Sequence, residues 1–153
     1  MLRTTMAVWQ FDLVLVPKGG SLPRRSGDGH DAPSVDPKRV EQARSWLVEN
    51  VGAPWQMLEG WYVYGGEKGN RVDVLLSADA SAEITARIDA REEATSFIRK
   101  LCALAELLDC LLFSLEMWSL VDVSPSALGF ALERSSAATF VRTPESVLRG
   151  DEH

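Results

Sequence analysis

The 153-residue chain contains only two histidines and two cysteines. His30 lies in a Gly- and Pro-rich stretch, and His153 is the last residue. A Ser-His-Asp or Cys-His centre needs an imidazole that its surroundings hold in place, and a structural zinc site needs four Cys or His ligands at defined spacings. The sequence therefore predicts no catalytic residue and no metal site.

The few cysteines also indicate a cellular compartment. Cys102 and Cys110 are eight residues apart in an expected helix, which separates them by about 12 Å, whereas a disulfide requires Cα atoms within about 7 Å. Two free cysteines are typical of a reducing compartment. Residues 1–17 lack the pattern of a signal peptide, and charges interrupt the apolar stretch 97–115. We expect a cytoplasmic protein that does not span a membrane.

Positive charge is the scarcer sign, with 16 Lys and Arg against 22 Asp and Glu and a net charge of -6. Nucleic-acid affinity is mostly attraction between cations and phosphates, and the only short basic cluster is Lys18, Arg24 and Arg25. The sequence therefore predicts no nucleic-acid partner. An acidic surface of this kind suits a basic protein partner.

The glycine-rich segment GGEKGN at residues 65–70 is the one candidate for a phosphate-binding loop. A phosphate loop leads from a strand into the N-terminus of a helix. Here the next segment is RVDVLLS at 71–77, whose alternation is typical of a strand. The glycines fit a tight hairpin turn better, and we expect no cofactor.

The pattern along the chain predicts one α+β domain over residues 1–153, with element order β-α-β-β-β-α-β-β-α. Strands joined by tight turns are antiparallel, and helices packed on one face of such a sheet make a two-layer sandwich. Residues 17–35 are expected to form a flexible loop, and residues 149–153 a polar tail. The expected strands are 7–16, 55–64, 71–77, 83–89, 111–116 and 120–123, and the expected helices begin at 36, near 89 or 95, and at 124.

The candidate site is the sheet face turned away from the helices, which we call the open face. Alternation places Trp61 and Val63 in the core and the two tyrosines between and after them on the open face, beside charged residues. Rigid tyrosines and charges suit protein recognition, and a tryptophan in the EMWS turn could anchor a partner. The predicted partner-binding residues are Asp12, Tyr62, Tyr64, Asp73, Arg87, Asp89 and Trp118.

Two other interpretations of these residues stay open. A pair of open-face carboxylates could serve a small carboxylate-dependent hydrolase, although Arg87 would favour their charged forms and cross-strand ion pairs would explain the same pattern. Trp118 could instead fold back onto its own sheet. A third possibility is a structural subunit that pairs an edge strand with its own copy, for example as a homodimer.

Three segments resemble a known class of proteins. They are the hairpin YGGEKGNRVDVLL, the apolar block FIRKLCALAELLDCLLF and the terminal SAATFVRTPESVL. Together with the small acidic format, they resemble bacterial immunity proteins of polymorphic toxin systems in overall layout, over most of the chain and without carrying over a functional residue. The resemblance implies a non-enzymatic inhibitor whose partner is a toxin domain, blocked by burial of its active site.

Overall fold

The computed structural model describes residues 9–142. Its elements include a short hairpin after the first strand and a fourth helix, neither of which the sequence predicts. In chain order they are β1 (Gln10–Pro17), β2 (Arg24–Ser26), β3 (Gly29–Asp31), α1 (Pro37–Asn50), β4 (Trp55–Leu58), β5 (Trp61–Gly65), β6 (Arg71–Leu76), β7 (Ala82–Asp89), α2 (Thr95–Leu107), β8 (Cys110–Ser114), β9 (Ser119–Val121), α3 (Pro125–Glu133) and α4 (Ser136–Arg142).

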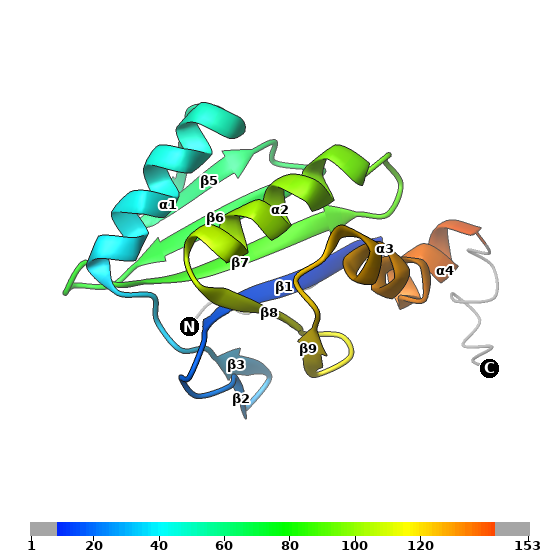
Figure 1. Cartoon of the computed structure of the whole chain (residues 1–153), viewed down its shortest axis with the longest axis horizontal. Helices are drawn as coiled ribbons and strands as arrows, with labels where there is room; N and C mark the ends of the chain where they lie inside the picture. Colours follow the sequence, from blue (N-terminus) through cyan, green and yellow to red (C-terminus); the bar gives the residue numbers. More distant parts are fainter. Residues whose placement is uncertain (1–8, 143–153) are drawn as a thin grey trace.

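Seven strands form one sheet in the order β4-β5-β6-β7-β1-β8-β9, and every neighbouring pair is antiparallel. The first strand of the chain therefore lies inside the sheet, between β7 and β8. Helices α1 and α2 lie across the same face of this sheet (Figure 1). The predicted α+β fold with a mostly antiparallel sheet is confirmed.

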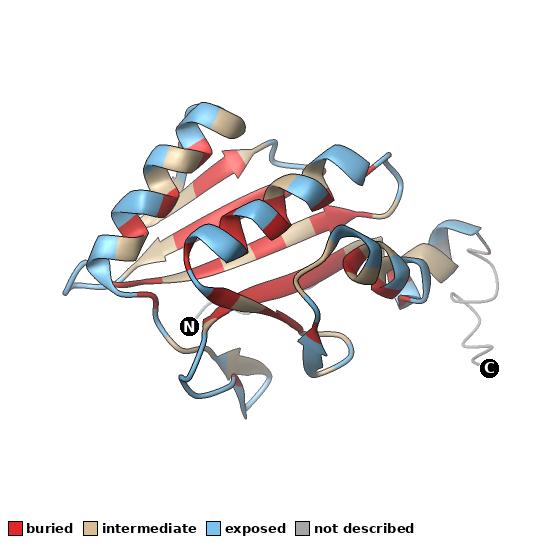
Figure 2. Cartoon of the chain, viewed as in Figure 1, coloured by how far each residue is buried: buried red, intermediate tan, exposed pale blue. Residues whose placement is uncertain are grey.

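The main core fills the space between this sheet face and the helices. Phe11, Leu13 and Leu15 of β1 point into it, as their alternation predicts, and each is fully buried. Helix α2 contributes a wide apolar stripe that includes Leu101 and Leu104. Figure 2 shows buried positions along the strands, and exposed positions on the outer sides of the helices.

Side-chain caps fix where two of the helices begin. The Asp36 carboxylate accepts a hydrogen bond from the Arg39 N–H at 3.0 Å, directly before Pro37 at the first helical position. The Ser124 hydroxyl accepts one from the Ala127 N–H at 3.0 Å in the same way. Both starts match the sequence expectation, because Asp and Ser before Pro are strong helix-start signals.

The third predicted helix, over residues 124–136, ends early, and a separate fourth helix follows it. Helix α3 ends at Glu133, and the buried Ser135 then starts α4. The Ser135 hydroxyl accepts a hydrogen bond from the Ala138 N–H at 3.1 Å. A serine side chain competes with the helical backbone for such bonds, and therefore favours a break and a new cap here.

The strand predicted over residues 55–64 is a hairpin. Strand β4 reverses at Glu59–Gly60 and pairs with β5, with a register shift between Gln56 and Leu58. Gly60 adopts a φ of 76°, which the turn requires and which glycine adopts without steric cost. The sequence predicts only a bulge at this glycine, because local pattern alone does not separate a bulge from a full reversal.

The connection over residues 17–35 is also more regular than the flexible loop that the sequence predicts. Strands β2 and β3 pair over three residues, and Gly27 opens the turn between them at a φ of 57°. Buried Val35 then forms an isolated bridge with Ala82 at the edge of β7. A high content of Gly, Pro and Ser indicates turns, but it does not exclude a short ladder between two turns.

Among residues 9–142, no helix combines the length and the apolar character that a membrane crossing needs. The helical turn that the sequence predicts at Thr143–Pro144 and the polar tail predicted over residues 149–153 lie outside the described residues.

Candidate functional site

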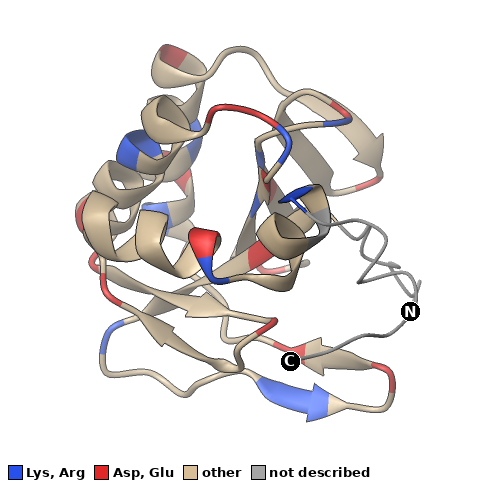
Figure 3. Cartoon of the chain, turned by 90° about the vertical axis from the view of Figure 1, so that its right-hand side faces the viewer, with Lys and Arg blue, Asp and Glu red and all other residues tan. Residues whose placement is uncertain are grey.

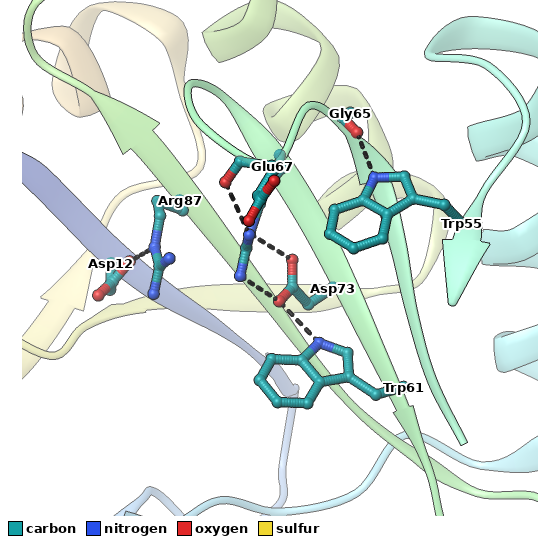
Figure 4. Close-up of polar contacts among 8 residues, drawn as sticks. Asp12, Trp55, Trp61, Gly65, Glu67, Asp73 and Arg87 are labelled. Carbon is teal, nitrogen blue, oxygen red and sulfur yellow. Dashed lines mark hydrogen bonds and ion pairs between the residues drawn. The ribbon is translucent and has the colours of Figure 1, made fainter. Parts of the chain in front are cut away.

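A row of charged residues crosses three strands on the sheet face opposite the helices (Figure 4). Asp12 on β1 lies directly opposite Arg87 on β7, and Arg87 lies directly opposite Arg71 on β6. The Arg87 Nε donates to the Asp12 Oδ1 at 2.9 Å. We call Asp12, Arg71, Asp73 and Arg87 the polar row.

Asp73 and Arg71 form the most buried ion pair of the polar row. The Arg71 Nη2 donates to the Asp73 Oδ2 at 3.1 Å, and the Arg71 Nε lies 3.0 Å from the Oδ1. The Trp61 Nε1 donates to the same Oδ2 at 2.9 Å, and the Arg71 Nη1 donates to the Glu67 carbonyl at 3.0 Å. Burial raises the pKa of Asp73, against the opposing effects of the Arg71 charge and the Trp61 hydrogen bond.

The two arginines of the row would repel each other if they stood alone, because they occupy directly opposed positions. Asp73 lies beside one and Asp12 beside the other, so the row carries two positive and two negative charges. The arrangement neutralises itself within the protein. A row of this kind holds strand register more readily than it attracts a charged ligand.

The carboxylates predicted to contact a partner are not available to one. Asp12 is 8%, Asp73 6% and Asp89 1% exposed. The prediction that these three carboxylates are exposed is therefore wrong. Alternation correctly predicts the face on which these carboxylates lie. It does not predict that each one is bound by an arginine, or that Trp61 also binds Asp73.

Asp89 has its own partner at the end of β7. The Arg91 Nη2 donates to the Asp89 Oδ2 at 2.7 Å, and the Arg91 Nε and backbone N–H donate to the Oδ1. Burial acts to raise the pKa of Asp89, but the hydrogen bonds from Arg91 outweigh it and lower the pKa below its usual range. The Arg91 guanidinium also lies 4.1 Å from the centre of the Trp9 ring.

Tyr62 and Tyr64 are on the opposite face from the one predicted. They pair with Val74 and Val72, whose side chains enter the main core, so both tyrosines face the helices. Tyr64 is fully buried, and its hydroxyl accepts a hydrogen bond from the Arg44 Nε at 3.0 Å. The predicted alternation is correct but its direction is wrong, because the residues on both sides of this strand are aromatic or apolar.

Trp118 folds back onto its own sheet. It adopts a φ of 51° in the turn between β8 and β9, and its ring packs edge-on against Phe113 with 5.1 Å between ring centres. The Arg25 guanidinium lies over the other side of the ring, 4.2 Å from its centre. Of the two outcomes that the sequence leaves open for Trp118, the structure shows the packed one.

The chemistry that the described residues offer is limited. No group of three His, Cys, Asp or Glu within residues 9–142 is placed to hold a metal ion. Burial raises the pKa of Cys102 and of Cys110 to about 11, which keeps both thiols protonated and poorly nucleophilic near neutral pH. The four carboxylates of the hydrolase alternative are each paired with a cationic or imidazole side chain. Asp12, Asp73 and Asp89 each bind an arginine, and Glu83 lies 3.1 Å from His30.

A different surface stands out once exposure is known. Strand β9, the turn before it and helix α3 enclose a recess of about 510 Å³, which we call the β9–α3 groove. Of the eight large apolar side chains that are exposed in the described chain, three line this groove: Met117 at 40%, Leu120 at 47% and Phe130 at 58% exposure. The remaining lining residues are Glu116, Val121, Asp122, Ala127, Ala131 and Arg134.

The sequence contains a partial signal for this groove. Helix α3 buries Leu128 and Ala131, and Phe130 lies between them on the outer side of the helix. A single exposed phenylalanine is ordinary, but one that lies beside other exposed apolar side chains marks a contact surface. Phe130 is not among the predicted partner-binding residues, because it lies outside the strands whose charges and aromatic side chains carry that prediction.

Charges of both signs border the groove. Glu116 and Asp122 are acidic, and the Arg134 guanidinium lies 5.2 Å from the centre of the Phe130 ring. Over the rest of the chain, acidic and basic positions are interspersed (Figure 3). The strand drawn largely in blue there is β2, with Arg24 and Arg25. Apolar exposure, and not charge, therefore distinguishes the groove.

A larger recess of about 680 Å³ lies along α1, but all of its lining residues come from that one helix and all are polar, from Lys38 to Ser45. A recess without apolar walls or residues from a second element is a solvated helix face. The β9–α3 groove, which joins three segments of the chain, is the better candidate site.

Comparisons of the chain with protein-family models, with curated proteins and with solved structures find no match.

Proposed function

We propose that this chain is a non-catalytic protein-binding module, and in its most concrete form an immunity-type inhibitor that binds and blocks a toxin domain in the bacterial cytoplasm. The observation that carries the proposal is the gathering of Met117, Leu120 and Phe130 around one groove at the edge of the sheet. Exposed apolar patches with a polar border are typical of protein interfaces.

The partner that fits best is a folded, basic protein domain that inserts an apolar side chain between Leu120 and Phe130. Aromatic and large apolar side chains at the centre of an interface supply most of its binding energy. The net charge of -6 attracts a basic partner over a distance, and Glu116 and Asp122 stand at the groove itself.

The test compares two aspartate variants of the full chain as affinity baits in a lysate of the native host. Phe130→Asp places a charge in the groove, whereas Leu107→Asp changes an equally apolar, 46% exposed position in the last turn of α2, outside the groove. We expect the native chain and the Leu107 variant to capture one protein that the Phe130 variant loses. For the purified pair, the affinity should fall roughly 30-fold or more with the Phe130 variant.

The same experiment separates the levels of the proposal. A captured protein that binds the Phe130 variant unchanged would move the interface away from the groove. The Phe130 variant could also lose a protein that does not harm cells when it is expressed without this chain. That result would support the binding module and contradict the immunity role.

A second candidate is a homodimer, because β9 is an edge strand with β8 as its one pairing partner in the described sheet. An exposed edge can pair with the same strand of a second copy. Light scattering distinguishes this candidate directly. A dimer that the Phe130→Asp variant converts to a monomer would assign the groove to a second copy of the chain.

A further inference from the structure

The β2–β3 hairpin is attached to the rest of the protein in an unusual way. At its start the Lys18 N–H donates to the Asp109 carbonyl at 3.1 Å, and after its end Val35 and Ala82 exchange two backbone hydrogen bonds of 2.7 and 3.0 Å. Between these two anchor points the hairpin is a separate two-stranded sheet. Side chains join it to the seven-stranded sheet.

A second apolar cluster, Val14, Val16 and Phe113, lies on the sheet face opposite the helices. Ala32, which follows β3, packs against the cluster, and so does Trp118. Every residue of β2 is exposed. The residue directly after the hairpin, Ala32, therefore helps to cover the cluster, and the hairpin is tied to Trp118, which covers it as well.

Two polar contacts fasten the hairpin. The His30 Nε2 lies 3.1 Å from the Glu83 Oε1 on β7, with both side chains about one quarter exposed. The Arg25 guanidinium lies over the Trp118 ring. Only the first of these contacts contains a group that titrates near neutral pH.

The charges around His30 come from four strands. Glu83 lies on β7, Asp12 on β1 and Asp31 on β3, and Arg25 on β2 is the residue opposite His30 in the hairpin ladder. The hydrogen bond to Glu83 is the largest cause that raises the pKa of His30. Burial opposes this rise, and the negative charges of Glu83, Asp31 and Asp12 add to it.

We propose that the β2–β3 hairpin is a strap that is fastened over the second apolar cluster while His30 is protonated, and that loosens when its imidazole becomes neutral. A neutral imidazole keeps at most an ordinary hydrogen bond to Glu83, because the attraction between opposite charges is lost. The strap contacts Trp118 in the turn before β9, but none of its own residues lines the β9–α3 groove. It requires no partner, so it stands independently of the proposed function.

The direction of the pH dependence follows from the raised pKa of His30. A group whose pKa is higher in the folded protein stabilises the fold fully below its unfolded pKa, which is about 6.5 for histidine. The stabilisation is lost as the pH rises through the raised value. The strap is therefore closed in mildly acidic solution and looser in alkaline solution.

Backbone amide hydrogen exchange of the full chain measures this opening. Protection factors, which correct for the intrinsic pH dependence of exchange, are compared between roughly pH 6 and pH 9, on either side of the histidine titration. We expect protection of the β2 and β3 amides to fall about threefold, the scale of a partly exposed ion pair. Strand β6 pairs with β5 and β7 and not with the hairpin. Its amides should therefore keep their protection at both pH values.

Three variants test whether the His30–Glu83 pair is the cause. His30→Gln and Glu83→Gln should each give a hairpin with low protection that no longer depends on pH. Arg25→Gln is the matched control, because it weakens the attachment at Trp118 without removing a group that titrates in this range. It should lower protection at every pH and keep the pH dependence.

The outcomes decide the proposal in either direction. Hairpin protection in the native chain that does not change with pH would overturn it. So would a His30→Gln variant that retains the native pH dependence, since the titrating group would then lie elsewhere.

Discussion

The polar row consists of charged side chains that are largely buried, whereas the β9–α3 groove is lined in part by apolar side chains that are exposed. Asp12, Arg71, Asp73 and Arg87 are strongly polar, yet they are buried or nearly so and bind one another. Leu120 and Phe130 are apolar, yet each has about half of its surface open to water. A reader of the sequence alone would assign the first set to the surface and the second to the core.

The difference has a physical explanation. A buried charge loses its hydration and persists only with a partner, so the polar row makes its strands depend on one register. An exposed apolar side chain contributes little to folding and promotes unwanted association. Residues of the second kind are therefore more informative about function, and those of the first kind about stability.

The largest expected effect comes from breaking the most buried pair. Arg71→Ala leaves the Asp73 carboxylate buried without its guanidinium, which should lower the free energy of unfolding by about 3–5 kcal/mol. Denaturant-induced unfolding of the purified protein measures this. Replacing both partners, as Arg71→Met with Asp73→Leu, should restore part of the loss. A single variant as stable as the native chain would show that the row is not structural.

Arg87→Ala tests the less buried half of the same row. The Asp12 carboxylate would lose its hydrogen bond from Arg87, but water can reach it in part, since the two side chains are 10% and 16% exposed. We expect a loss of about 1–3 kcal/mol in the same unfolding experiment. A larger loss of stability than for Arg71→Ala would contradict the inference that the more buried pair contributes more to stability.

The groove should behave differently in that experiment. Phe130→Gln removes an exposed side chain and replaces it with a good helix former, so the free energy of unfolding should change by no more than about 0.5 kcal/mol. Partner binding should still weaken. A strong loss of stability would mean that Phe130 supports the fold, and the contrast between the two regions would fail.

The smallest effect concerns the acid side of the stability curve. The lowered pKa of Asp89 means that its ion pair with Arg91 stabilises the protein above the ordinary carboxyl pKa, and that this stabilisation is lost as the pH falls through the lowered value. Arg91→Gln should therefore reduce stability at neutral pH more than at strongly acidic pH. Thermal unfolding at a series of pH values measures this, and parallel curves for the two proteins would contradict it.

Much of the fold could be predicted from the sequence because alternation and helix-start signals are local. The pattern of Phe11, Leu13 and Leu15 identified a core strand, and Asp36 and Ser124 identified two helix starts. The β4–β5 reversal and the β2–β3 hairpin could not be predicted from such local patterns. Whether a glycine bends a strand or turns it back depends on which distant strand is available to pair.

The candidate site was less predictable than the fold. Placing Asp73 correctly on its face did not show that Arg71 and Trp61 bind it, because that depends on strand register across a turn. Tyr62 and Tyr64 went to the wrong face because an aromatic strand has no polar side to orient it. The β9–α3 groove brings together residues from a turn, a strand and a helix, and no single segment carries its pattern.

The position of β1 inside the sheet has a consequence for synthesis. Its first partner strand begins at Ala82, 65 residues after β1 ends at Pro17. At roughly 5–20 residues per second, a ribosome needs about 3–13 s to deliver that partner. During this time β1, whose side chains are almost all buried in the folded protein, has neither of its neighbouring strands, and both of its backbone edges are unpaired.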